Sequence, residues 1–181
     1  WQHARGTIAG MDIGTGSAAI YPLLGTRMYG WAWVATELDP ESVVWARHNI
    51  RLNAFDSHIC VRRSARASSL ILDNLHPGEC LDFTMCNPPF FGSASEHMSH
   101  PGTVCSASAS ELVTEGGELH FISTMVSESL QLRERVKWYT SMVGCKRHLK
   151  PLQTLLRGAG VRNVRTVELI SGRTARWAIA W

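Results

Sequence analysis

The segment Ile8-Ala9-Gly10-Met11-Asp12-Ile13-Gly14-Thr15-Gly16 carries the pattern that decides the fold. Its first six residues form an apolar run typical of a buried strand, and the run ends in the glycine-rich Gly14-Thr15-Gly16. Glycines at this point let the backbone turn tightly and approach a ligand, and Ser17 is a suitable N-cap for a helix that we expect to run to about Gly25. In a parallel α/β sheet this turn lies at the carboxyl end of the first strand, where ligands bind. The pattern therefore predicts a βα unit with a ligand site, and a tight turn that merely requires glycine is the alternative.

Strands and helices alternate along the rest of the chain. We expect strands at 31–37, 58–62, 81–86 and 136–143, and helices at 40–53, 119–130 and 149–156. The tail 161–181 predicts an antiparallel hairpin with Ser171-Gly172 at its turn. This order predicts an α/β fold with a parallel, doubly wound sheet and antiparallel pairing at one edge. The segment 92–114 has no period and predicts a long loop, which in a domain of this size usually has a function.

The composition is that of one globular domain, because 45% of the 181 residues are hydrophobic and 18% are charged. No run approaches the roughly 20 apolar residues that a membrane span requires, and no signal-peptide pattern is present. The five cysteines are scattered without a CxxC pair, which favours a reducing compartment, nuclear or cytoplasmic, over a disulfide framework or a zinc site. We therefore expect a single domain over residues 1–181, with no metal and no membrane contact.

Charge is divided unevenly along the chain. Residues 131–181 contain eleven Lys and Arg residues against two acids, whereas residues 1–130 contain seven against thirteen. Such a division is typical of a protein with one surface that meets a polyanion such as a nucleic acid. Ordinary solvated faces of helices and strands are the alternative.

Glu37 ends the second expected strand, 23 residues beyond Gly14. A carboxylate at this place can accept both ribose hydroxyls of an adenosine-containing cofactor. A plain surface acid in the turn Glu37-Leu38-Asp39-Pro40 is the alternative.

The tetrapeptide Asn87-Pro88-Pro89-Phe90 directly follows the strand expected at 81–86. The amide oxygen of Asn87 and the carbonyl of Pro88 can accept the two N–H bonds of an aromatic amine, which aims the nitrogen lone pair at a methyl donor. The prolines fix φ and remove competing donors, and Phe90 offers a stacking face for a flipped base. No general base is needed before transfer, so catalysis consists mostly of positioning. The tetrapeptide predicts amine methylation, and a Pro-Pro turn after a strand is the alternative.

These motifs belong to a longer series of segments, namely 12–16, 20–25, 35–37, 85–91, 115–119, 129–132, 138–139 and 172–181. In this order they closely resemble the methyltransferase-like protein 16 family of RNA adenine-N6 methyltransferases. The resemblance implies a Rossmann-like class I methyltransferase with a mostly parallel, seven-stranded sheet and a C-terminal antiparallel hairpin. It also implies S-adenosylmethionine as cofactor, S-adenosylhomocysteine as product, and structured RNA as partner, either U6 snRNA or messenger RNA hairpins. Nothing in the sequence indicates an obligate protein partner.

The resemblance further assigns roles to individual residues. The catalytic residues would be Asn87, Pro88, Pro89 and Phe90. The cofactor would be held by Gly14, Gly16, Ala18, Glu37, Ser69 and Asn87. RNA would be contacted by Phe91, Arg173 and Arg176, which agrees with the basic C-terminal third.

The chain departs from the family pattern in two places. Nothing in it matches the basic N-terminal module with which the family grips RNA, and the loop after Phe91 is rich in Ser and Ala where the family has basic residues. Both departures predict weaker RNA binding and weaker cofactor retention, without a change in the chemistry.

Two other functions remain open from the residues. The same Asn-Pro-Pro chemistry serves DNA adenine and protein glutamine methyltransferases, and the basic tail favours a nucleic acid over a protein. An RNA-binding module without catalysis is the third reading. The intact glycine turn, Glu37 and Asn87–Phe90 argue against it.

Overall fold

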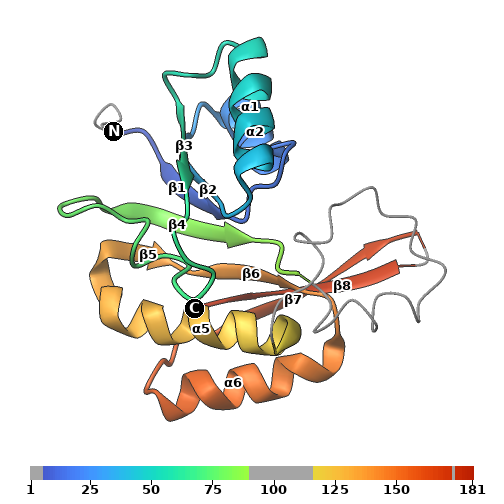
Figure 1. The fold of residues 1–181 in the computed structure, drawn as a ribbon. Helices are drawn as coiled ribbons and strands as arrows, with labels where there is room; N and C mark the ends of the chain where they lie inside the picture. The colour runs from blue at the N-terminus through green and yellow to red at the C-terminus, as the bar shows by residue number, and fades with distance from the viewer. Residues whose placement is uncertain (1–5, 90–115, 173) are drawn as a thin grey trace.

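The strand that opens the fold, β1 (Ala9–Ile13), is buried along its whole length. The computed structural model describes residues 6–89, 116–172 and 174–181. Figure 1 shows the elements in chain order. The further strands are β2 (Ala32–Glu37), β3 (Ile59–Arg63), β4 (Leu81–Cys86), β5 (Val136–Trp138), β6 (Thr140–Val143), β7 (Arg165–Ser171) and β8 (Thr174–Ala180). The helices are α1 (Ile20–Tyr29), α2 (Pro40–Leu52), α5 (Gly117–Leu132) and α6 (Leu149–Gly158), with short 3₁₀ turns η1 (Arg133–Arg135) and η2 (Lys146–His148).

Two sheets carry the fold. A five-stranded sheet has the order β3-β2-β1-β4-β5, with every neighbouring pair parallel. A three-stranded antiparallel sheet has the order β6-β8-β7, and its β7–β8 hairpin turns at Ser171-Gly172 as the sequence predicts. The α/β class, the mostly parallel sheet and the C-terminal antiparallel hairpin are therefore confirmed.

The single strand expected at 136–143 is interrupted at Tyr139, where the two sheets meet. The Tyr139 N–H donates to the Trp181 carbonyl at 2.9 Å, and the Trp181 N–H donates back at 3.0 Å. One residue later, the Thr140 hydroxyl donates to the Thr84 carbonyl at 2.6 Å, so a side chain continues the link to β4. Because the backbone partner changes from β4 to β8 at this point, the hydrogen bonding divides the expected seven-stranded sheet into two.

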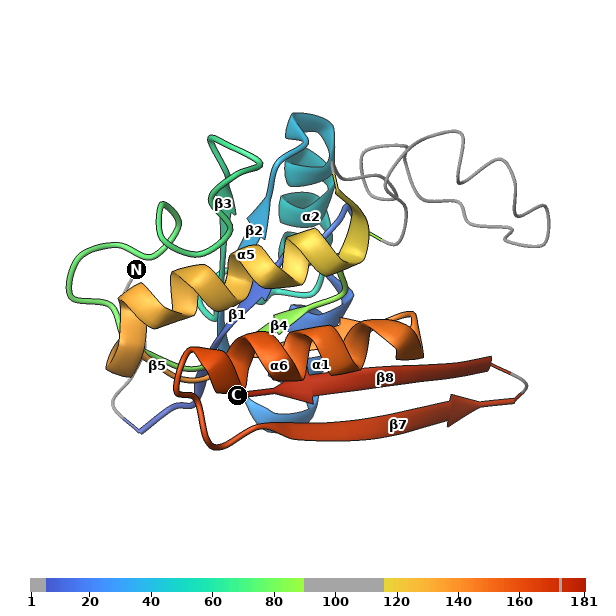
Figure 2. The same cartoon turned by 90° about the horizontal axis from the view of Figure 1, so that it is seen from below.

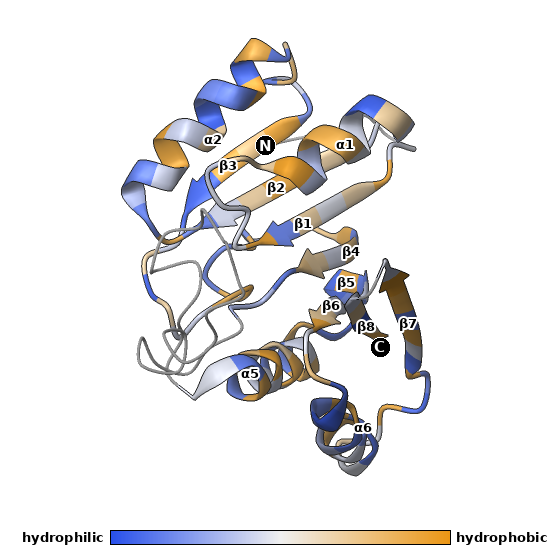
Figure 3. Cartoon of the chain, turned by 90° about the vertical axis from the view of Figure 1, so that its right-hand side faces the viewer, coloured by the Kyte–Doolittle hydropathy of each residue, from blue (hydrophilic) through white to orange (hydrophobic). Residues whose placement is uncertain are grey.

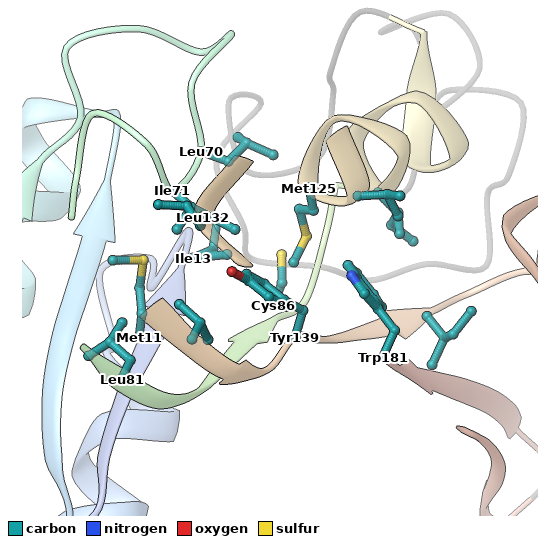
Figure 4. Packing of buried hydrophobic residues seen from close by; sticks show 14 of the residues in the cluster. Met11, Ile13, Leu70, Ile71, Leu81, Cys86, Met125, Leu132, Tyr139 and Trp181 are labelled. Atoms are coloured by element: carbon teal, nitrogen blue, oxygen red, sulfur yellow. The ribbon is translucent and has the colours of Figure 1, made fainter. Parts of the chain in front are cut away.

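Helices cover both faces of the parallel sheet, with α1 and α2 on one side and α5 and α6 on the other (Figure 3). Successive side chains of β2 pack on opposite faces of the sheet. Val34 packs in the core under α5 and α6, whereas Trp33 and Ala35 pack with α2. Strands buried on both faces are typical of parallel sheets. The larger core lies between the sheet and α5, and it contains Met11, Cys86, Met125, Tyr139 and Trp181 (Figure 4).

The helix α1 begins later and ends later than the sequence predicts. Ser17 is not its N-cap, because Ala19 takes that place in a left-handed conformation with φ of 48°. The Ser17 carbonyl instead accepts a hydrogen bond from the Asn49 side chain at 2.9 Å. The helix continues through Gly25 to Tyr29, and Gly30 is its C-cap. Gly25 does not end the helix; it allows close packing, since a Cβ there would collide with the Trp33 ring. The other predicted elements lie within a few residues of their observed bounds.

Gly10 permits the close contact between β1 and an aromatic cluster. A Cβ at this position would lie 2.6 Å from Phe83 Cζ and 2.9 Å from the Trp33 ring. These two rings pack edge to face with centroids 5.2 Å apart, so neither can move freely. We expect Gly10→Ala to lower the free energy of unfolding by about 1–3 kcal/mol, measured by urea denaturation. Gly158→Ala is the matched control, because its Cβ would meet no atom within 4 Å. An equal effect of the two substitutions would contradict this account of Gly10.

Candidate functional site

Three neighbouring strands bring the predicted site residues to one level of the sheet. Ile13, the last residue of β1, pairs with Thr36 on one side and with Cys86 on the other. The residues that follow these three are Gly14, Glu37 and Asn87. The register therefore places the glycine turn, the carboxylate and the amide side by side at the carboxyl edge, which is where open α/β sheets bind ligands.

The glycine turn takes left-handed backbone conformations at both of its glycines and exposes the first of them. Gly14 and Gly16 both have positive φ, of 70° and 64°, which glycine adopts without strain. Gly14 is exposed, and a Cβ built on it would meet no atom of the described residues within 4 Å. Ala18, the other predicted cofactor residue in this turn, is also exposed. These features fit a turn whose backbone a ligand can approach closely.

Glu37 is buried, and backbone groups hold its carboxylate in place. Oε1 accepts hydrogen bonds from the amides of Leu38 at 2.7 Å and Asp39 at 3.0 Å. Oε2 accepts one from the Gly16 amide at 2.9 Å, which ties the carboxylate to the glycine turn. A carboxylate has about four acceptor positions, so capacity remains for a hydroxyl of a bound ligand. Glu37 is thus a buried, hydrogen-bonded carboxylate and not a plain surface acid.

Asp12 is a buried acid at the same place that sequence reasoning did not single out. Its Oδ2 accepts a hydrogen bond from the Thr15 hydroxyl at 2.7 Å, while Oδ1 has no hydrogen-bond partner among the described residues. Burial raises the pKa of Asp12 from 3.8 to about 7; the Thr15 hydrogen bond opposes the rise and the charge of Glu37 adds to it. An unpaired oxygen beneath the glycine turn fits a site that receives a polar or cationic ligand group.

The raised pKa of Asp12 makes stability depend on pH in a defined direction. Because the folded chain binds this proton more tightly than the unfolded chain, the contribution of Asp12 to stability is greatest at low pH and falls between about pH 4 and pH 7. This one group should lower the free energy of unfolding by about 2 kcal/mol from pH 5 to pH 7. The measurement is urea denaturation of the wild type and Asp12→Asn at both pH values. The readout is how much more the free energy of unfolding changes with pH in the wild type than in the variant. Parallel pH profiles would show that Asp12 does not titrate in this window.

Of the predicted catalytic tetrapeptide, the structure describes Asn87, Pro88 and Pro89. Asn87 is exposed at the end of β4, whereas Pro88 is buried and Cys86 before it is buried in the core. The strand is thus fixed up to Cys86 and presents the Asn87 amide to solvent at the level of Gly14. Phe90 and the predicted RNA-binding residues Phe91 and Arg173 lie outside the described residues, as does the loop expected at 92–114.

Ser69 lies in the segment after β3, and α5 holds this segment in place. Ser69 is buried, and its hydroxyl accepts a hydrogen bond from the Asp73 amide at 3.1 Å. The buried carboxylate of Glu128 on α5 accepts hydrogen bonds from the amides of Leu70 at 3.0 Å, Ile71 at 2.6 Å and Leu72 at 3.3 Å. Sequence reasoning missed Glu128, because its partners are 56 to 58 residues away in the chain.

Comparison with known proteins identifies the family. The chain matches the Methyltransf_10 model, described as RNA methyltransferase, over residues 2–181. The chain belongs to this RNA methyltransferase family. It is 40% identical to the RNA N(6)-adenosine-methyltransferase mettl16 of Danio rerio, over 95% of this chain and 38% of that protein. It is 38% identical to the U6 small nuclear RNA (adenine-(43)-N(6))-methyltransferase of Schizosaccharomyces pombe, over 99% of this chain and 47% of that protein. The chain therefore spans less than half the length of these two relatives.

Solved structures agree with this family membership. The human METTL16 catalytic domain in complex with MAT2A 3′UTR hairpin 1 has a TM-score of 0.87 and 39% identity, covering 96% of this chain and 63% of that one. The N-terminal domain of human METTL16 in complex with SAH has a TM-score of 0.80 and 38% identity, covering 97% of this chain and 61% of that one. At these identities, the likeness of this chain to the METTL16 domains concerns its sequence as well as its fold.

Arg176 lies at the same edge of the molecule as Asn87. Arg176 is half-buried on β8, one residue before Trp177, and Trp177 pairs with Val143 at the end of β6. The β7–β8 hairpin extends from this point alongside α6 (Figure 2). Among the described residues no group of three or more His, Cys, Asp or Glu side chains could hold a metal ion. No helix in the described parts of the chain is long and apolar enough to cross a membrane.

Proposed function

We propose that this chain is the catalytic domain of an S-adenosylmethionine-dependent RNA methyltransferase that methylates the N6 amine of an adenosine. The observation that carries the proposal is the strand register that sets Gly14, Glu37 and Asn87 at one level of the sheet edge. At this edge, Gly14 and Glu37 suit an adenosine-containing cofactor, and Asn87 suits a planar amine. Residues 1–181 are proposed to form a single methyltransferase domain.

The cofactor would lie across the glycine turn. Glu37 would accept the ribose hydroxyls, and the backbone at Gly14, Gly16 and Ala18 would line the rest of the site with Ser69 and Asn87. The Asp12 carboxylate, buried and with one unpaired oxygen, would favour a cationic group nearby. S-adenosylmethionine, when bound, supplies a methyl group on a positively charged sulfur. The residues present fit this cofactor, and the proposed site requires no metal.

Asn87 and Pro88 would position the amine that receives the methyl group. The Asn87 side-chain oxygen accepts one N–H of the adenine amine, and the Pro88 carbonyl accepts the other. The nitrogen lone pair would then be aimed at the methyl group that S-adenosylmethionine supplies when bound, and the extra proton of the methylated amine would leave to solvent. Phe90 is proposed to stack against the flipped base, which is the usual way to hold a base outside the duplex. Catalysis by this arrangement depends on positioning rather than on a general base.

The substrate is proposed to be structured RNA, either U6 snRNA or a messenger RNA hairpin. The relatives are named for U6 and for RNA adenosine N6, and one structural neighbour holds a MAT2A 3′UTR hairpin. Phe91, Arg173 and Arg176 would contact this RNA. An RNA methyltransferase of this kind would work in the nucleus or cytoplasm without an obligate protein partner.

Label from tritiated S-adenosylmethionine tests the substrate class. The chain is offered U6 snRNA, the same RNA with its candidate adenosine changed to guanosine, an adenine-containing duplex DNA, and a release-factor-like protein. We expect label in the unmutated RNA alone. Label in DNA or protein would agree with the proposed role of the catalytic tetrapeptide and would contradict RNA as the substrate. Measurable RNA binding without label anywhere would instead support the non-catalytic binding module.

A further inference from the structure

The 3₁₀ turn Lys146–His148, called the 146–148 turn below, presents two exposed cations. Lys146 and Arg147 are both exposed, and neither forms an ion pair with a carboxylate of the described chain. The Lys146 ammonium lies 5.9 Å from the centroid of the Trp177 ring, and Arg147 Nε lies 3.5 Å from His148 Nε2. By contrast, Lys137 is neutralised by Asp82 at 2.7 Å. Within the part of the chain that the structure describes, Lys146 and Arg147 therefore carry positive charge that no carboxylate neutralises.

A buried carboxylate fixes the backbone of the 146–148 turn. Glu118, only 3% exposed near the start of α5, accepts hydrogen bonds from the amides of Gly144 and Cys145, the latter at 3.4 Å. It also lies 2.6 Å from His148 Nδ1. Because Glu118 holds both sides of Lys146 and Arg147, the two cations project from a fixed support. A fixed support reduces the conformational entropy that is lost when such side chains bind a ligand.

The strand geometry puts the 146–148 turn at the edge of the molecule that carries Asn87, the proposed catalytic residue. The Thr140 side chain is bonded to the Thr84 carbonyl, which sets the level of β6 against β4. The β4–β5 register, in which Phe83 pairs with Trp138, likewise brings the end of β6 at Val143 to about the level of Asn87. In Figure 1, β4 and β6 point towards the side of the molecule at which α5 and α6 begin. The 146–148 turn thus lies at the edge that carries the glycine turn and Asn87.

The cations do not serve the stability of the neighbouring helix. The 146–148 turn leads directly into α6, and Lys150 adds a third cation in its first turn, which contains no acidic residue. Positive charges at a helix N-terminus oppose the macrodipole and destabilise the helix. A local arrangement that opposes stability is most often found where function requires it.

We propose that the 146–148 turn binds the phosphate backbone of the substrate RNA beside the target adenosine, with Lys146 and Arg147 as the contacting residues. The inference rests on the proposed function and adds a surface to it. The contact carries no base specificity, since phosphate contacts set the register of a strand and base contacts specify its sequence. Its role is to hold the strand while the target base reaches Asn87.

The test compares two double substitutions in the 181-residue chain. Lys146→Ala with Arg147→Ala removes the two cations at the catalytic edge. Arg27→Ala with Arg51→Ala is the matched control, because it removes the same charge from the last turns of α1 and α2, at the opposite edge. Binding of U6 snRNA is measured by fluorescence anisotropy at several salt concentrations, alongside S-adenosylmethionine affinity, thermal midpoint and methyl transfer. The charge-reversing pair Lys146→Glu with Arg147→Glu provides a second variant.

We expect the Lys146/Arg147 variant to bind RNA on the order of 10-fold more weakly near physiological salt, and its salt slope to fall by about 1.4–1.8. The charge reversal should weaken binding further, while cofactor affinity stays at the wild-type value and the thermal midpoint does not fall, because the charges removed oppose the dipole of α6. If the wild type methylates RNA and both pairs of alanine substitutions reduce affinity equally, the inference is overturned and the proposed function stands. If the wild type neither binds nor methylates RNA, both are overturned.

Discussion

Asn87→Ala is expected to lower kcat for adenosine methylation by about 10²–10³-fold, as the loss of one preorganised hydrogen-bonding group in an active site typically does. The amide is exposed at the end of a strand that is fixed in the core up to Cys86, so its removal takes away an acceptor without disturbing packing. The amine would then keep only one of its two acceptors. The measurement is single-turnover methyl transfer with RNA and cofactor both saturating.

Asn53→Ala is the control for this substitution. Asn53 caps the C-terminal end of α2 and is exposed like Asn87, but it lies at the other edge of the sheet. We expect its single-turnover rate to equal that of the wild type. An Asn87→Ala enzyme that kept more than about a tenth of the wild-type rate would show that this amide does not position the amine.

Glu128→Ala is expected to lower the free energy of unfolding by about 3–5 kcal/mol, which is among the largest effects a single substitution has. The Glu128 carboxylate is the acceptor for three backbone amides, at 3.0, 2.6 and 3.3 Å, of the segment after β3. Alanine leaves these donors without a partner in a mostly buried place, where each unpaired group is costly. The measurement is urea denaturation followed by tryptophan fluorescence.

Two further variants separate this effect from the loss of a charge. Glu128→Gln keeps the shape and one carbonyl oxygen, so we expect a smaller loss of stability than with alanine. Glu134→Ala removes an exposed glutamate six residues later and should change the free energy of unfolding by no more than about 0.5 kcal/mol. Equal losses in Glu128→Ala and Glu134→Ala would mean that the three amides find other partners.

The predictable part of the fold is the part that short-range patterns encode. The continuous apolar run of β1 and the strand at Leu81–Cys86 follow directly from hydropathy, because strands of a parallel sheet are buried on both faces. The start of helix α2 could be predicted equally well from the sequence. The Asp39 side chain accepts a hydrogen bond from the Ser42 amide at 2.7 Å, and Pro40 lies in the first turn.

The ends of helices and strands depend on tertiary contacts, so local sequence patterns predict them wrongly at two places. Ser17 has the chemistry of an N-cap, yet its carbonyl is engaged by Asn49 of another helix and α1 starts three residues later. Tyr139 continues the apolar pattern of its strand, and nothing local reveals that its backbone pairs with Trp181, 42 positions later.

The candidate site divides in the same way. Gly14, Glu37 and Asn87 each lie at or just beyond the end of a strand that the sequence predicts. Because parallel strands bring their carboxyl ends together, it could be predicted that these three residues lie close to one another. Glu118 and Glu128 could not, since a glutamate on a helix reads as a surface residue until its amide partners are known. The unpaired oxygen of Asp12 likewise appears only when the packing around it is known.

The position of the new methyl group tests the central claim most directly. The chain is incubated with U6 snRNA and S-adenosylmethionine carrying a trideuterated methyl group, and the RNA is then digested to nucleosides and analysed by mass spectrometry against authentic standards. We expect the deuterated methyl group on adenosine N6, and its loss with Asn87→Ala. Deuterated methyl on adenine N1, on cytidine or on a ribose 2′-hydroxyl would contradict the account, because Asn87 and Pro88 would then not be holding an exocyclic amine.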